Sequence, residues 1–119
     1  MPSSDKAVSD KTLAVSIVVP VRNEAENILP LIEEIRAALE SRWDYEIVYV
    51  NDGSTDATAE RLAEARARWP NVRQLKHAVS SGQSAAVRSG VRAANGVIVA
   101  TLDGDGQNNP AFLPQLIAA

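Results

Sequence analysis

The sequence has no cysteine and only one histidine, His77. Disulfides and thiolate metal centres are therefore excluded, as is a zinc site built from histidine and cysteine. Positive charge is not in excess either, because 12 basic residues stand against 15 acidic ones and give a formal net charge of −3. Without a basic footprint, nucleic acid is excluded as a partner. No apolar run reaches the ~18–20 residues that a bilayer span needs.

The N-terminal residues lack an apolar signal core as well. Residues 1–11 are rich in Ser, Asp and Lys and show no periodicity, which predicts a flexible leader. The missing signal favours a cytoplasmic protein. Residues 12–119 are then expected to form one α/β domain, since a chain of this length can bury roughly two-thirds of its unfolded surface. Because the sequence ends inside a predicted helix, we expect the domain to be truncated at its C-terminus.

Short apolar runs alternate with helical patterns from Leu13 onward. The expected strands cover residues 13–20, 45–50, 72–77 and 97–102. The expected helices cover residues 24–39, 56–68 and 82–94, and a further helix begins at Pro110. The first, second and fourth strands fit burial on both faces, whereas the third alternates and is expected to be more exposed. This order predicts an α/β fold of three layers, α/β/α, around a mainly parallel sheet.

Two helix starts carry capping signals. Asn23, followed three residues later by Glu26, is close to a capping box. Ser54 or Thr55 is expected to cap the helix at 56–68. Small residues also recur every four positions from Gly82 to Ala94, a pattern that predicts close packing of the third helix on the sheet.

Polar side chains follow three of the four expected strands. In a parallel α/β sheet the ligand lies outside the carboxyl ends of the strands, which meet at one edge. We therefore expect these side chains to share a crevice. They are Arg22, Asn23 and Glu24 after the first strand, Asn51 and Asp52 after the second, and Asp103, Asp105 and Gln107 after the fourth.

Asp103 and Asp105 form the sharpest of these signals. Two carboxylates separated by Gly104 would repel each other if left unpaired, and Mg²⁺ or Mn²⁺ would relieve that repulsion, with Gln107 as a further oxygen ligand. Asp-Gly pairs also make ordinary turns, so both interpretations stay open on these residues alone. An EF-hand is excluded because its glycine and glutamate positions hold Asn108 and Pro114. A Walker A loop and a complete G-x-G-x-x-G are also absent.

Several other polar residues have simpler explanations. Asp52 on its own fits a cap of the helix that follows it, and Glu24 fits a partner of a helix dipole. Arg88 and Arg92 are spaced to reach a phosphate, but solvated surface arginines are the more common case. His77 ends an exposed strand and is interpreted as ordinary surface.

Three sequence blocks, taken together and in order, resemble a known family. They are SIVVPVRNEAENI, EIVYVNDGSTDAT and VATLDGDGQNNP, and they are spread over nearly all of residues 13–119. The blocks look like the nucleotide-sugar half of family 2 inverting glycosyltransferases, which have the GT-A fold with a Rossmann-like nucleotide-binding half. Within that family they are most similar to the polyprenyl-phosphate sugar transferases of the dolichol-phosphate mannose synthase type.

The resemblance implies a binding role for each matching position. Pro20, Arg22 and Glu24 would surround the nucleotide base and ribose, and Val50 and Asp52 would lie beside the base. Arg22 replaces the family's usual aromatic residue, so a cation–π or polar contact would replace stacking. Asn51 replaces a common aspartate. The Asp-x-Asp motif is Asp103-Gly104-Asp105, and with Gln107 it would hold the Mg²⁺ or Mn²⁺ that bridges the donor diphosphate.

The implied reaction is sugar transfer with inversion from a GDP- or UDP-sugar to a polyprenyl phosphate, dolichol or undecaprenyl. The residues that position the acceptor lie, in this family, beyond the end of this chain, so no catalytic base is nominated. The longer parent protein would work at the cytoplasmic face of a membrane. Two alternatives remain: a nucleotide-binding domain without turnover, and a phospho-receiver signalling domain. A truncated sheet edge could also pair two copies into a homodimer.

Overall fold

Four parallel strands form the sheet of this chain. The computed structural model describes residues 13–105 and 109–118, so the predicted leader at 1–11 lies outside the described residues. The strand order is β3-β2-β1-β4. The elements in chain order are β1 (Leu13–Val21), α2 (Ala25–Leu39), β2 (Tyr45–Asp52), α3 (Thr58–Arg68), β3 (Val72–His77), α4 (Gln83–Ala93), β4 (Gly96–Thr101), the 3₁₀ turn η1 (Pro110–Phe112) and α5 (Leu113–Ala118).

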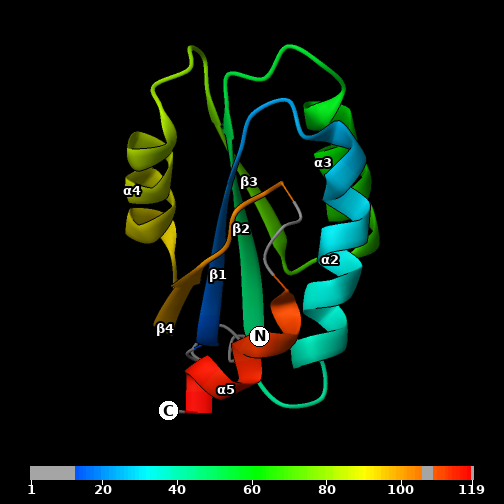
Figure 1. Ribbon diagram of the computed structural model, residues 1–119, viewed down its shortest axis with the longest axis vertical. Helices are drawn as coiled ribbons and strands as arrows, with labels where there is room; N and C mark the ends of the chain where they lie inside the picture. Colours follow the sequence, from blue (N-terminus) through cyan, green and yellow to red (C-terminus); the bar gives the residue numbers. More distant parts are fainter. Residues whose placement is uncertain (1–12, 106–108, 119) are drawn as a thin grey trace, which may run out of the picture.

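Helices cover both faces of this sheet. Figure 1 shows α4 on one face and α2 and α3 on the other, with the sheet between them. The predicted three-layer α/β/α class with a parallel sheet is therefore confirmed. None of the helices in the described ranges is long and apolar enough to cross a membrane.

The two central strands carry the core. Every residue of β2 is buried, and so are the last seven residues of β1, as their β-branched apolar runs predict. On the α4 face the packing is unusually close, because a Cβ placed on Gly90 would collide with Val18 and lie 3.1 Å from Val50 Cγ2. The predicted close packing is thus confirmed for Ala86 and Gly90, whereas a Cβ on Gly82, just before the helix, would meet nothing within 4 Å.

The prediction that the fourth strand is buried is wrong. β4 lies at the edge of the sheet and pairs with β1, and Val97 on it is 74% exposed. Ile98 and Val99 are also exposed. An apolar run predicts that a strand forms but not which elements cover it. Helix α4 packs over β1, β2 and β3, which leaves β4 exposed. Pairing of two copies along this edge stays a prediction.

The predicted helix caps are also wrong. Helix α2 begins at Ala25 without a side-chain cap, and Asn23 has a left-handed φ of 57°. The Asn23 Oδ1 atom accepts hydrogen bonds from the main-chain N–H groups of Thr55 (2.8 Å) and Asp56 (3.3 Å). Ser54 Oγ in turn accepts from the Asn23 N–H at 2.9 Å. These residues join the β1–α2 loop to the β2–α3 loop. Their side-chain oxygens accept hydrogen bonds from the other loop instead of capping the helix that follows their own.

Candidate functional site

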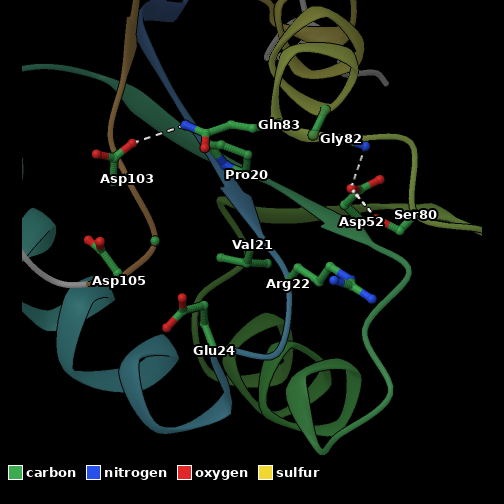
Figure 2. A pocket seen from close by; sticks show the side chains of 12 residues that line it. Pro20, Val21, Arg22, Glu24, Asp52, Ser80, Gly82, Gln83, Asp103 and Asp105 are labelled. Carbon is green, nitrogen blue, oxygen red and sulfur yellow. Dashed lines mark hydrogen bonds between the residues drawn. The ribbon is translucent and has the colours of Figure 1, made fainter.

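A pocket of about 410 Å³ opens at the carboxyl ends of the strands, beside the N-terminus of α4 (Figure 2). This is the edge where a parallel α/β sheet is expected to bind its ligand. Its walls come from the end of β1 and the segment after it, the end of β2, the loop before α4 with the first turn of that helix, and the turn after β4. The lining residues are Pro20, Val21, Arg22, Glu24, Asp52, Ser80, Gly82, Gln83, Ala86, Asp103, Gly104 and Asp105.

Most of the residues singled out by the sequence meet in this pocket. The structure brings together Pro20, Arg22, Glu24, Asp52, Asp103, Gly104 and Asp105. Val50 is not among the lining residues, because its side chain is fully buried and its Cγ2 lies under Gly90 of α4. Gln107, the third predicted metal ligand, lies outside the described residues.

Asp52 binds the start of α4 rather than the start of α3. Its Oδ1 accepts from the N–H of Ser81 (2.8 Å), and its Oδ2 accepts from the N–H of Gly82 (2.9 Å) and the hydroxyl of Ser80 (2.9 Å). The ring Nδ1 of His77 lies 2.7 Å from Oδ1. The simpler prediction, that Asp52 caps the helix following it, is therefore wrong. A carboxylate has about four lone-pair positions, and protein groups use all four here.

The pKa of Asp52 is well below its ordinary value. Burial alone would raise it, since only 4% of the residue is exposed. The hydrogen bonds from the Ser81 N–H, His77, the Gly82 N–H and Ser80 favour the ionised form and together outweigh burial. The pocket wall therefore holds a fixed negative charge, bound to the N–H groups of Ser81 and Gly82 just before α4.

His77 is a further residue of this region that the sequence misassigned. Its side chain is 20% exposed and joins Asp52 to Ser89, whose Oγ lies 2.9 Å from Nε2. The parallel pairing of β2 and β3 sets His77 directly opposite Asp52. Interpreting His77 as ordinary surface overlooked that the third strand also ends at this edge.

The same oversight explains four of the five lining residues that the sequence did not single out; the fifth, Val21, is the last residue of β1. Ser80, Gly82, Gln83 and Ala86 all follow β3, and no chemistry-bearing pattern marked that strand end. The only available signal was positional, because every parallel strand of the sheet ends at the pocket.

The turn after β4 holds Asp103 and Asp105 against the pocket. Figure 2 shows Gln83 of α4 reaching Asp103, with Gln83 Nε2 donating to Asp103 Oδ1 at 3.2 Å. Gly104 between them cannot carry a side chain without a shift, since a Cβ there would collide with Val21 and lie 2.9 Å from the Pro20 carbonyl oxygen. Backbone contact with the end of β1 thus fixes where the two carboxylates begin.

The donor set of this turn fits Mg²⁺ or Mn²⁺. Both cations prefer oxygen ligands, and Mg²⁺ is commonly bound by one or two carboxylates together with substrate phosphates. In the described ranges no three His, Cys, Asp or Glu side chains gather as a metal site. The pair Asp103 and Asp105 therefore suits a cation shared with a phosphate-bearing ligand better than a cage built by protein alone.

Comparison with known proteins decides the family. Residues 16–119 match the sequence model of Glycosyl transferase family 2. The chain belongs to glycosyltransferase family 2. The predicted family and its enzyme class are thus confirmed, and the phospho-receiver alternative is set aside.

Two named relatives are similar to this chain over most of its length. It is 38% identical over 114 residues to the dodecaprenyl-phosphate galacturonate synthase of Rhizobium johnstonii, covering 91% of this chain and 32% of that protein. It is 36% identical over 107 residues to the dolichol-phosphate mannosyltransferase of Pyrococcus furiosus, covering 90% of this chain and 30% of that protein. The chain thus spans about a third of the length of these relatives.

A solved structure shows the same fold. The mannosyltransferase PcManGT from Pyrobaculum calidifontis, in complex with GDP-Man and Mn²⁺, matches with a TM-score of 0.71 at 27% identity. The match covers 80% of this chain and 28% of that one. The predicted GT-A type of α/β fold is confirmed by this likeness.

Proposed function

We propose that this chain binds a nucleoside-diphosphate sugar and a divalent cation, as the donor part of a family 2 glycosyltransferase. The observation that carries the proposal is the single pocket that gathers Arg22, Glu24 and Asp52 with the carboxylates of Asp103 and Asp105. A structural neighbour in complex with GDP-Man and Mn²⁺ supports both ligands.

The base and ribose are assigned to the side of the pocket formed by Pro20, Arg22, Glu24 and Asp52. Arg22 is exposed and offers a planar cation, whereas the usual aromatic would offer a stacking face. Because protein donors fill all four positions of Asp52, a base N–H reaching Oδ2 would replace the Ser80 hydroxyl. Of the four donors, the Ser80 hydroxyl is the one that can leave Asp52 by rotation of its own side chain.

The diphosphate is assigned to the side formed by Asp103, Gly104 and Asp105, with Gln107 as a further ligand. A bound Mg²⁺ or Mn²⁺ would supply Lewis-acid stabilisation of the negative charge that builds on the leaving diphosphate. The chain itself contributes two fixed carboxylates and the Gln83 side chain, which orients Asp103 from α4. The close contact of Gly104 with β1 keeps this turn at a constant distance from the base side.

The acceptor is proposed to be a polyprenyl phosphate, dolichol or undecaprenyl phosphate, at the cytoplasmic face of a membrane. The names of the relatives, a dodecaprenyl-phosphate and a dolichol-phosphate transferase, support this acceptor class. A phosphate is already ionised near neutral pH, so inverting attack on the sugar needs no general base from the described residues. We accordingly assign no catalytic base.

The alternative of binding without turnover applies to this chain as a separate molecule. It spans about a third of the length of its relatives, so we expect it to bind the donor and to transfer nothing. Transfer is expected only from the longer parent protein.

The test is isothermal titration of the chain with GDP, UDP and their sugars, with and without Mn²⁺. We expect Mn²⁺-dependent binding of one nucleotide, abolished in Asp103→Ala plus Asp105→Ala. The matched control is Glu33→Ala plus Glu64→Ala, which removes two acids exposed outside the pocket. Binding that survives the aspartate double variant, or a folded chain that binds no nucleotide, contradicts the proposal.

A further inference from the structure

His77 lies directly behind the pocket wall, between β2 and α4. Its Nδ1 is 2.7 Å from Asp52 Oδ1 and its Nε2 is 2.9 Å from Ser89 Oγ. An ionised carboxylate only accepts hydrogen bonds, so Nδ1 must carry the proton of the first contact. The Ser89 hydroxyl satisfies Nε2 from the other side of the ring. Both ring nitrogens are therefore used, and the orientation of the ring is fixed.

Asp52, which His77 contacts, binds the segment that forms one wall of the pocket. Asp52 receives the N–H groups of Ser81 and Gly82, and the main chain at Ser80 packs so closely on Gly53 that a Cβ there would lie 2.5 Å from Ser80 N. The next residue, Gln83, donates to Asp103. Hydrogen bonds thus run from His77 through Asp52 and the start of α4 to the proposed metal side of the pocket.

The order Ser89, His77, Asp52 has the hydrogen-bond sequence of a serine hydrolase triad, but its placement excludes that chemistry. Neither Ser89 nor His77 lines the pocket, and Ser89 lies in the middle of α4, where it contacts the Nε2 side of the His77 ring. No substrate in the pocket would touch either group. The remaining role that the geometry allows His77 is to position Asp52.

We propose that His77 is a positioning residue of the donor site. By donating from Nδ1 to Asp52, it sets where the Ser80–Gly82 segment and the first turn of α4 stand in the pocket, and thereby the affinity for the nucleotide. The inference rests on the proposed function, because it takes the nucleotide as the ligand of this pocket.

Two substitutions separate the two nitrogens of the ring. In His77→Asn the side-chain amide stands near the place of Nδ1 and can donate to Asp52. In His77→Gln it stands near the place of Nε2 and reaches toward Ser89 instead. We expect His77→Gln to weaken nucleotide binding about tenfold and His77→Asn to stay within about threefold of the wild type, because a hydrogen bond to a charged group is the one removed.

The measurement is titration of the full 119-residue chain with the nucleotide that binds, with thermal unfolding of each variant as the check on folding. Ser89→Ala is the matched control, since it leaves the contact between His77 and Asp52 in place, and we expect affinity within about twofold of the wild type. A merely structural role would lower the unfolding temperature of both His77 variants and leave their affinities equal. Equal affinities of the two variants, whether retained or reduced, overturn the proposal.

A second measurement needs no variant. His77 is the single histidine of the chain, so the ring ¹⁵N resonances in an NMR spectrum belong to it alone. We expect a protonated Nδ1 in the free protein and a shift of both ring signals when nucleotide is added. Ring signals that ignore a nucleotide which does bind overturn the inference and leave the proposed function standing. A folded wild-type chain that binds neither GDP nor UDP overturns both.

Discussion

Two buried acids on the same face of β2 invite comparison, because each binds one end of α4. Asp52, at the carboxyl end of the strand, accepts the N–H groups of Ser81 and Gly82 just before the helix. Glu46, at the amino end, accepts the N–H of Asn95 just after it, at 2.7 Å. The helix is thus anchored to one strand by two carboxylates.

The two sites differ in what completes them. Glu46 also accepts from the Ser16 hydroxyl (2.6 Å) and from the guanidinium of Arg73 (2.9 Å), which itself donates to the Ala93 carbonyl at the end of α4. Glu46 thus has a permanent cation beside it and borders no described pocket. Asp52 has an imidazole in place of a guanidinium and faces the pocket. The comparison shows that the same kind of anchor, a buried carboxylate, stands beside a guanidinium at one end of α4 and beside the pocket at the other, and only the second is in a position to act on a ligand.

Removal of Glu46, the acid at the amino end of β2, should have the largest effect on the free energy of unfolding. Glu46→Ala leaves three buried or half-buried donors without their acceptor, and we expect it to lower the free energy of unfolding by about 3 kcal/mol. Urea unfolding measures this. The control is Glu64→Ala, an exposed acid paired with Arg61, which should cost less than about 0.5 kcal/mol. If the two variants are equally stable, Glu46 does not anchor α4.

A substitution of Asp52, the acid beside the pocket, should lower both the free energy of unfolding and the affinity for nucleotide. Asp52→Asn puts an N–H₂ donor where the carboxylate accepts, so we expect a loss of about 2 kcal/mol in unfolding free energy and of at least about tenfold in nucleotide affinity. Titration beside urea unfolding separates the two effects. Glu46→Gln is the matched control, since folded molecules of that variant should keep wild-type affinity. An affinity loss shared equally by both variants would contradict the division between the two ends.

Lowering the pH tests both anchors together, because the pKa values of Asp52 and Glu46 are both lowered in the folded protein. Burial opposes the shift of Glu46, and the hydrogen bonds from Ser16, Asn95 and Arg73 outweigh it. A depressed folded pKa gives stability that is present above the ordinary pKa, 3.8 for Asp52 and 4.5 for Glu46, and is lost as pH falls through the folded value. We therefore expect the unfolding free energy to fall below about pH 4.5 and to fall less steeply in Asp52→Asn and in Glu46→Gln. Urea unfolding between pH 2.5 and 7 tests this, and identical slopes in all three proteins would refute it.

The smallest effects are expected from the two hydroxyls that donate to these acids. Ser16 is fully buried, so Ser16→Ala should cost about 1 kcal/mol of stability and leave affinity unchanged. Ser80→Ala should cost under about 0.5 kcal/mol and tighten nucleotide binding about twofold, because the base no longer displaces a donor from Asp52. Unfolding and titration of the pair measure both quantities. Weaker binding by Ser80→Ala would place the base elsewhere.

Much of this architecture is readable from the chain alone. The apolar runs of β1 and β2 and the helical patterns between strands predict the layers, because central parallel strands must be apolar on both faces. The rule for strand ends then predicts most of the pocket. What local patterns cannot supply is the identity of neighbours. Asp52 reaches residues 25 to 30 positions away instead of the adjacent helix, and the pairing of β2 with β3 brings His77 to it. The exposure of β4 likewise depends on what covers it.

The double anchoring of α4 also restricts how far this part of the chain can change in length. From Glu46 to Asp52 the strand advances about 20 Å, and the 11 residues of α4 span about 16 Å, so the helix and the short links to the anchored N–H groups of Gly82 and Asn95 together cover the interval. One additional turn would add about 5.4 Å and carry one end beyond hydrogen-bond reach of its acid. Insertions and deletions among natural sequences of this kind are therefore expected around the exposed Val79, between β3 and the helix, and not within α4 itself.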